Sequence, residues 1–186
     1  MLPLTPPQTV GPFFAILVPE RGALTLASSD ASGPRAAVEG SVRDGVGHPV
    51  PDALIEVWQA NADGHFNHPE DPASPGPQTG FDGFGRIHAD ADGAFAIETI
   101  MPGSVPGPEN TPQAPHLVVG LFARGLLTRL VTRIYFENDP LNADDPILTM
   151  LPADRRSTLI ATELAPGRYH FDVVLQGPGE TVFFDV

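Results

Sequence analysis

The sequence predicts an all-β fold, a β-sandwich of about eight short strands with an extended N-terminal arm and long loops. Two observations support this prediction. Glycine and proline number 19 and 22 in 186 residues, and because proline costs about 3 kcal/mol inside a helix, long helices are excluded. Short runs rich in Val, Ile and Phe recur between Gly, Pro, Asn and Asp residues, a pattern typical of strands. A hydrophobic content of 41% argues against disorder.

The elements begin with residues 1–35, which alternate short apolar runs with Pro, Gly and Ser. We expect an extended arm over 1–35 and the sandwich domain over 36–186. Residues 94–100 illustrate the strand pattern, with Phe95, Ile97 and Thr99 on one face. The expected strands cover residues 37–43, 53–59, 86–89, 94–100, 117–123, 130–136, 168–175 and 181–185.

The connections complete the predicted fold. Three Asp-Gly pairs, at 44–45, 63–64 and 92–93, each predict a turn with its glycine at positive φ. A helix is expected over residues 153–161. Residues 65–84 and 102–115 are expected to be long loops, and such loops are often functional or covered by a neighbouring subunit.

The charge of the chain narrows the classes of partner. All ten basic residues are arginine, against 23 acidic residues, for a net charge of −13. Such a surface repels phosphate backbones, so nucleic-acid binding is not expected. A membrane-spanning helix needs about 18 consecutive apolar residues, and no run in this sequence approaches that length. The N-terminus lacks a signal-peptide pattern. We therefore expect a cytoplasmic protein. The absence of cysteine excludes disulfides and thiol nucleophiles.

Histidines and arginines are the candidate groups for chemistry. His65 and His68 are spaced to present two imidazoles to a metal, or else lie in a solvated loop. His116 follows a proline-flanked loop, as a capped edge histidine or a functional one would. Arg124 ends the strand at 117–123, where it could pair with a structural carboxylate or hold an anionic ligand. A Gly-x-Ser-x-Gly pattern is absent and no helix pattern follows the glycines of 80–85, so neither a hydrolase nor a nucleotide site is expected.

Several longer motifs follow one another in the order of a known family. They are the stretch 42–64, which ends Glu56-Val-Trp58-Gln-Ala-Asn-Ala-Asp-Gly64, then Gly83-Phe-Gly-Arg86, Asp90-Ala-Asp-Gly93, Thr99-Ile-Met-Pro-Gly103, an opening Gln8-Thr9-Val-Gly-Pro12 and an ending Gly177-Pro-Gly-Glu180. Together they resemble the intradiol ring-cleavage dioxygenases over nearly the whole chain. The resemblance implies a β-sandwich and a non-haem Fe(III) held by two tyrosines and two histidines. Ferric iron favours phenolate oxygen and binds the two oxygens of a catechol.

The iron ligands of that family are mostly absent from this chain. At the two tyrosine positions it has Phe66 and Val105, and the His-x-His pair becomes His116-Leu-Val118. An arginine just before that pair is replaced by Gln113. One imidazole cannot hold Fe(III), so the resemblance implies an alpha subunit with no metal of its own. Positions 66, 105, 116 and 118 are then remnants of a metal site, and the iron belongs to a related beta chain.

The resemblance also places residues of this chain near the substrate of such a complex. It assigns Thr9 and Arg124 to substrate binding and Gly11, Pro12 and Phe13 to the lining of the pocket. The substrate implied is protocatechuate, a catechol with a carboxylate, which O₂ converts to 3-carboxy-cis,cis-muconate. An acidic subunit would repel this anion without a dedicated cation. The implied partner is the beta chain, in αβ units assembled into a larger oligomer.

Three functions remain open on the sequence alone. The chain is an alpha subunit that is active only with a beta chain, an aromatic-acid-binding module without catalysis, or a structural partner chain. Retention of Arg124 and Thr9 favours the first. Glu56, Trp58 and Arg86 are expected to serve core packing and strand-end pairing rather than chemistry.

Overall fold

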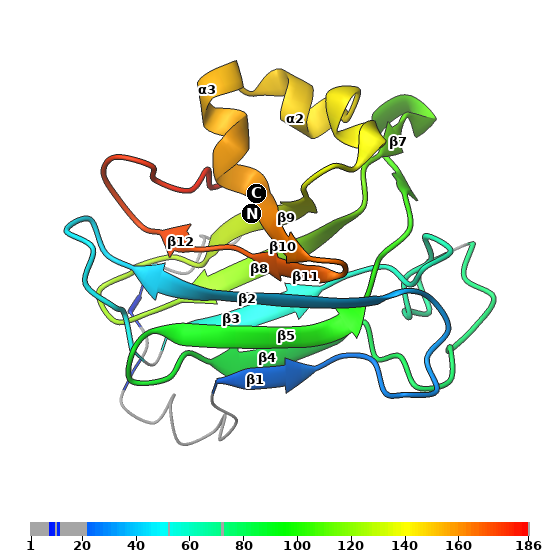
Figure 1. Cartoon of the computed structure of the whole chain (residues 1–186), viewed down its shortest axis with the longest axis horizontal. Helices are drawn as coiled ribbons and strands as arrows, with labels where there is room; N and C mark the ends of the chain where they lie inside the picture. Colours follow the sequence, from blue (N-terminus) through cyan, green and yellow to red (C-terminus); the bar gives the residue numbers. More distant parts are fainter. Residues whose placement is uncertain (1–7, 10, 12–21, 52, 72, 186) are drawn as a thin grey trace, which may run out of the picture.

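The computed structural model describes residues 8, 9, 11, 22–51, 53–71 and 73–185, and over this part the chain is mostly β (Figure 1). Ten strands form one mixed sheet in the order β1-β5-β2-β11-β10-β9-β8-β3-β4, with β12 paired to β2, and β6 pairs with β7 separately. The strands are β1 (Ala23–Thr25), β2 (Arg35–Arg43), β3 (Leu54–Trp58), β4 (Phe84–His88), β5 (Ala94–Ile100), β6 (Val105–Pro106), β7 (Pro112–Gln113), β8 (His116–Phe122), β9 (Leu130–Phe136), β10 (Ile160–Ala165), β11 (Arg168–His170) and β12 (Val173–Val174).

The sheet curves until its two ends meet, so that it is nearly closed like a barrel. Gly22 N–H donates to the His88 carbonyl at 2.9 Å, and Asp82 N–H donates to the Leu26 carbonyl at 3.0 Å. These bonds join the flanks of β1 to β4 and to the loop before it. The expected strands therefore form one continuous, folded-over sheet rather than two sheets with separate hydrogen bonding.

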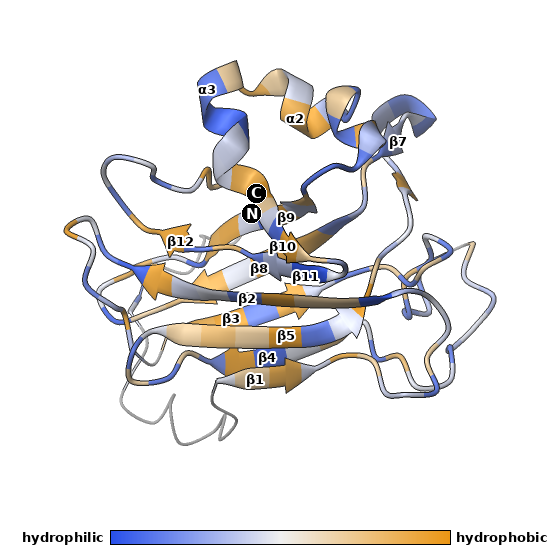
Figure 2. Cartoon of the chain, viewed as in Figure 1, coloured by the Kyte–Doolittle hydropathy of each residue, from blue (hydrophilic) through white to orange (hydrophobic). Residues whose placement is uncertain are grey.

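The core lies between the two halves of this sheet. Along β5, Phe95, Ile97 and Thr99 are buried, as the alternation predicted, and Ile100 is buried as well. Figure 2 shows orange and blue residues mixed along the strands, as expected when one face of a strand meets a core. The fully buried side chains of this core include Val38, Ile55, Val57, Ile87, Ile97, Leu117, Leu121 and Ile134.

Two short helices, α2 (Pro146–Met150) and α3 (Ala153–Arg156), lie together on one side of the sheet (Figure 1). The 3₁₀ turns are η1 (Pro108–Asn110), η2 (Pro140–Ala143) and η3 (Ser157–Leu159). The helix predicted over 153–161 is thus shorter than expected, because the chain enters β10 at Ile160. None of the helices within the described ranges is long and apolar enough to span a bilayer.

The predicted strand 168–175 is divided into β11 and β12, which both run parallel to β2. Gly40 of β2 explains this division, because a Cβ there would overlap the Phe171 carbonyl. Asp172 replaces the lost ladder contact by accepting the Ser41 N–H at 2.8 Å. The predicted strand 181–185 is reduced to an isolated bridge between Phe184 and Val131.

Two of the three predicted Asp-Gly turns have the expected geometry, with Gly64 at φ 82° and Gly93 at φ 74°. The turn after Asp44 differs, because the positive φ falls on Gly47, at 84°. Asp44 Oδ1 accepts the Val46 N–H at 3.0 Å and the His48 N–H at 2.8 Å. This side-chain turn moves the left-handed residue two positions further along.

The expected arm includes residues that join the sheet. β1 pairs in parallel with β5, and Leu24 and Leu26 are buried in the core. These positions lie before residue 36, where the domain was expected to begin. The boundary between arm and domain stays a prediction, because residues 12–21 lie outside the described part of the chain.

Candidate functional site

The connection between β8 and β9 carries Arg124 near its start, two residues after β8 ends. Leu126 N–H donates to the Ala123 carbonyl at 3.2 Å, which closes a four-residue turn. Gly125 occupies the third position of this turn with φ 85°, as a type II turn requires. Ala123 is buried, whereas Arg124 and Gly125 are exposed. The turn therefore presents the arginine at the end of a buried strand.

Thr9 lies against this same turn. Its Oγ1 accepts the Gly125 N–H at 3.2 Å across 116 residues of sequence. The structure thus brings together the two residues that the resemblance placed near a substrate. Gly11 is described and exposed. Pro12 and Phe13, the other expected lining residues, lie outside the described residues.

An open cavity of about 380 Å³ lies where the connection enters β9, and Arg129 is one of its lining residues. Thr128 and Leu130 flank this arginine, and Phe183, Phe184 and Asp185 complete the lining. The connection therefore borders a hollow that has both a cation and aromatic rings on its surface.

The expected remnants of a metal site lie on and beside β8. Phe66 packs its ring on Trp58 with the centroids 6.0 Å apart. Val118 is paired with Trp58 on one side and with Arg133 on the other. Val105 is buried and pairs with Gln113. None of the side chains of Phe66, Val105 and Val118 offers a donor atom to a metal.

His116, the remaining imidazole at these positions, is engaged inside the protein. Its Nδ1 lies 2.7 Å from the Ala114 carbonyl, and its ring lies 5.3 Å from that of Tyr135, centroid to centroid. Burial, and next the charge of Arg133, lower the pKa of His116 to about 4. The imidazole is therefore neutral at neutral pH, and its Nδ1–H donates to the carbonyl.

A guanidinium lies among these positions. Arg133 donates from Nη1 to Gln113 Oε1 at 2.6 Å and to the Tyr135 hydroxyl at 3.1 Å. The Tyr135 hydroxyl in turn donates to Asp145 Oδ1 at 3.2 Å. Burial raises the pKa of Tyr135, so it stays a neutral phenol. Apolar side chains, one engaged imidazole and a fixed cation do not fit Fe(III).

Asp145 is the residue of this network that sequence reasoning missed. It is fully buried; Oδ2 accepts the Ala114 N–H at 2.8 Å and Oδ1 accepts two N–H groups at the start of α2, each at 2.9 Å. The signal that could have found it is Asp145-Pro146, an N-cap residue followed by proline at the first helical position.

The other candidate residues described here make contacts within the chain. His68 Nδ1 accepts the Glu70 N–H at 3.2 Å and the ring lies edge-on to Trp58. Over the described ranges, no three His, Asp or Glu side chains are grouped as a metal ion would need. Glu56 and Arg86, for which packing and strand-end pairing were expected, form an ion pair, with Arg86 Nε 2.7 Å from Glu56 Oε1.

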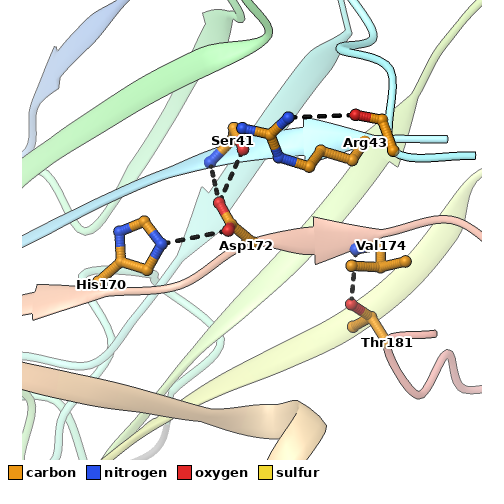
Figure 3. Close-up of polar contacts among 7 residues, drawn as sticks. Ser41, Arg43, His170, Asp172, Val174 and Thr181 are labelled. Atoms are coloured by element: carbon orange, nitrogen blue, oxygen red, sulfur yellow. Dashed lines mark hydrogen bonds and ion pairs between the residues drawn. The ribbon is translucent and has the colours of Figure 1, made fainter. Parts of the chain in front are cut away.

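Figure 3 shows a serine, an aspartate and a histidine in a row at the β11–β12 break. Ser41 Oγ donates to Asp172 Oδ1 at 2.7 Å, and His170 Nε2 lies 3.2 Å from Asp172 Oδ2. The carboxylate lies between the other two, so the imidazole cannot take the serine proton as a hydrolytic triad requires. The cluster is a strand-break support, in agreement with the absence of a hydrolase motif.

Comparisons with known proteins agree with this picture. A family profile described as "Dioxygenase" matches residues 10–177. The chain is 42% identical over 198 aligned residues to the protocatechuate 3,4-dioxygenase alpha chain of Burkholderia cepacia, covering 98% of this chain and 97% of the relative. It is 40% identical to the beta chain of the same enzyme and organism, covering 80% of this chain and 67% of the relative.

A solved structure shares the fold. It is the dioxygenase domain of a dioxygenase carbohydrate-binding protein fusion from Streptomyces sp. SirexAA-E. The two are 29% identical with a TM-score of 0.63, over 93% of this chain and 98% of that one.

Proposed function

Because this chain belongs to the intradiol dioxygenase family and is a homologue of the protocatechuate 3,4-dioxygenase alpha chain, we propose that it is the metal-free alpha subunit of such an enzyme. It completes the substrate pocket of a beta chain that carries the iron. The assembled enzyme opens protocatechuate between its two hydroxyl-bearing carbons and adds both atoms of O₂, which gives 3-carboxy-cis,cis-muconate. The family uses non-haem Fe(III), and in this proposal only the beta chain holds it.

The observation that carries the proposal is the contact between Thr9 and the Arg124–Gly125 turn. The chain has lost the ligands of a metal centre, yet it keeps an arginine on a turn that a second, distant segment fixes. A guanidinium can bind a carboxylate through two parallel hydrogen bonds. In this proposal Arg124 holds the substrate carboxylate, and thereby orients the two ring hydroxyls toward the beta chain.

The similarity to a beta chain supports the partner. Two chains of one family that are 40% identical over 159 aligned residues can pair through related surfaces while only one keeps the metal. In the alpha-like chain the former metal positions then serve packing, as Phe66 on Trp58 and the bonded His116 illustrate.

The test is to assemble Arg124→Ala with an iron-loaded beta chain and to compare protocatechuate with catechol, which has no carboxylate. Truncating one member of a buried charge pair costs about 2–5 kcal/mol. The kcat/KM for protocatechuate should therefore fall by a factor between roughly 30 and several thousand. The loss on catechol should be far smaller. Arg124→Lys should recover part of the activity, because an ammonium lacks the planar fork.

Arg43→Ala serves as the matched control, since Arg43 is a half-buried arginine at the end of β2 that bonds the Gly47 carbonyl at 3.2 Å and should have no effect on either substrate. Equal losses on both substrates, in an Arg124→Ala complex with full iron content and normal size, would contradict the carboxylate role. They would favour a purely structural partner chain.

A further inference from the structure

We propose that Arg129 is a positioning residue. It fixes the second half of the β8–β9 connection, residues 127–129, to the sheet and so sets the position of Arg124. The inference rests on the proposed function, because it concerns how the substrate contact is held. Arg129 itself does not touch the substrate in this proposal.

The first evidence is an ion pair between the connection and β3, with β8 lying between the two. Arg129 Nε lies 3.3 Å from Glu56 Oε2, and Arg86 Nε of β4 lies 2.7 Å from Glu56 Oε1. The Glu56 side chain is only 13% exposed, against 43% for Arg129. The Glu56 carboxylate on β3 therefore binds two arginines, one from each side. Of these two, Arg129 belongs to the connection and Arg86 does not.

The second evidence is the glycine beneath the guanidinium. Gly120 of β8 is paired with Glu56 of β3 and with Val131 of β9. A Cβ at Gly120 would lie 2.7 Å from Arg129 Cζ, and closer still to Nε and Nη2. The missing side chain thus leaves the space through which Arg129 reaches across β8 to the carboxylate.

The third evidence is the way the connection is held. Its first half is anchored from within, since Ala123 is buried and Leu126 packs against the core. The second half is exposed, with Leu127 at 60% exposure, followed by the exposed Thr128 and Arg129. The Arg129–Glu56 pair ties the end of this half to the sheet, five residues after Arg124.

The ion pair is suited to position a loop rather than to stabilise the fold. Partly exposed pairs contribute little to the free energy of unfolding, so its removal should leave a folded subunit. The place of a substrate-binding group matters more, because a misplacement of about 1 Å can cost about 100-fold in rate. An effect on substrate binding without an effect on stability is therefore expected.

Arg129→Met and Gly120→Ala break the pair in two independent ways, one by removing the guanidinium and the other by displacing it. Each is assembled with an iron-loaded beta chain. We expect kcat/KM for protocatechuate to fall by up to about 100-fold, with iron content and kcat/KM for catechol unchanged. Arg129→Lys, which keeps the charge, should recover part of the loss. Arg86→Met is the matched control, because Arg86 pairs with the same carboxylate from outside the connection, and its kcat/KM for protocatechuate should stay within about twofold.

Arg124→Ala, measured in the same assays, distinguishes a failure of the positioning role from a failure of the proposed function. If Arg124→Ala loses protocatechuate selectively and Arg129→Met does not, the positioning role is wrong while the proposed function stands. If Arg124→Ala shows no selectivity, the proposed function fails and this inference fails with it. Equal changes in Arg86→Met and Arg129→Met would also overturn the inference, since they would reflect the loss of Glu56 pairing in general.

Discussion

His116 is a buried imidazole that stays neutral because burial and the nearby Arg133 disfavour its charge. Its pKa of about 4 lies below the unfolded value of 6.5, so the unfolded chain binds more protons between these two pH values. The free energy of unfolding is therefore unaffected by this group above pH 6.5 and falls as the pH drops from 6.5 to 4. The total loss is about 3 kcal/mol.

We predict that His116→Asn removes this part of the pH dependence, because an asparagine amide can still donate to the Ala114 carbonyl but does not titrate. Urea unfolding of both proteins at pH 7, 5.5 and 4 measures the difference. The wild type should lose about 3 kcal/mol more than the variant over this range. Parallel pH profiles would show that His116 is charged in the fold or has no shifted pKa.

At the scale of single residues, the sequence was informative where chemistry depends on residue identity alone. Phe66, Val105 and Val118 cannot bind iron whatever their surroundings. The role of Arg133 could not be predicted, because it depends on the register that places it opposite Val118 and on its hydrogen bond to Gln113, 20 residues away. The contact between Thr9 and Gly125 joins segments 116 residues apart, and no local pattern indicates it.

Helix α2 depends on its N-cap, Asp145, more than on its own five residues. An isolated helix of this length is unstable in water. Asp145 supplies acceptors to two N–H groups of the helix, to the Ala114 N–H and to the Tyr135 hydroxyl. The carboxylate thereby joins α2 to β9 and to the segment that leads into β8.

We predict that Asp145→Ala lowers the free energy of unfolding by about 3–5 kcal/mol, since a cap is lost and buried donors are left without an acceptor. Asp139→Ala is the matched control: Asp139 caps η2 through Leu141 N–H at 2.9 Å but is only half-buried, and its loss should cost about 1 kcal/mol or less. Equilibrium urea unfolding compares them. Similar losses in the two variants would mean that the buried contacts of Asp145 contribute nothing beyond capping.

The elements predicted best are the strands with clear alternation or long apolar runs, such as β5, β8 and β9. The region 146–165 was predicted least well. Helices of four or five residues span little more than one turn and show no periodicity, so α2 was missed and α3 was merged with the strand that follows. The break between β11 and β12 depends on the Phe171 carbonyl beside Gly40, which is a tertiary contact.

For the whole molecule, we predict that the purified chain without a beta chain is colourless and holds no stoichiometric iron. Tyrosinate–Fe(III) charge transfer gives enzymes of this family a visible absorbance, and both tyrosine positions are lost here. Metal analysis and a visible spectrum of the isolated chain are the measurement, with the assembled complex as the positive control. One iron per isolated chain together with a visible band would contradict the metal-free subunit.

The strand content of the whole molecule was predictable from the sequence, but the pairing order was not. Alternation indicates which residues face a core and says nothing about which strands are neighbours. β2 has β5 on one side and β11 on the other, and its side-chain bond to Asp172 spans 131 residues. Only the folded sheet shows that β5 and β11, which are far apart in the sequence, flank the same strand.

This position of β2 has a consequence for the order of events during synthesis. The ribosome adds about 5–20 residues per second, so β2 waits roughly 7–25 s for β11 and β12 to be made. Its other side is covered earlier, by the antiparallel partner β5. Throughout the interval the nascent chain presents one open strand edge, the kind of surface on which chains pair wrongly with each other. The sheet can close only when the last third of the chain has left the ribosome.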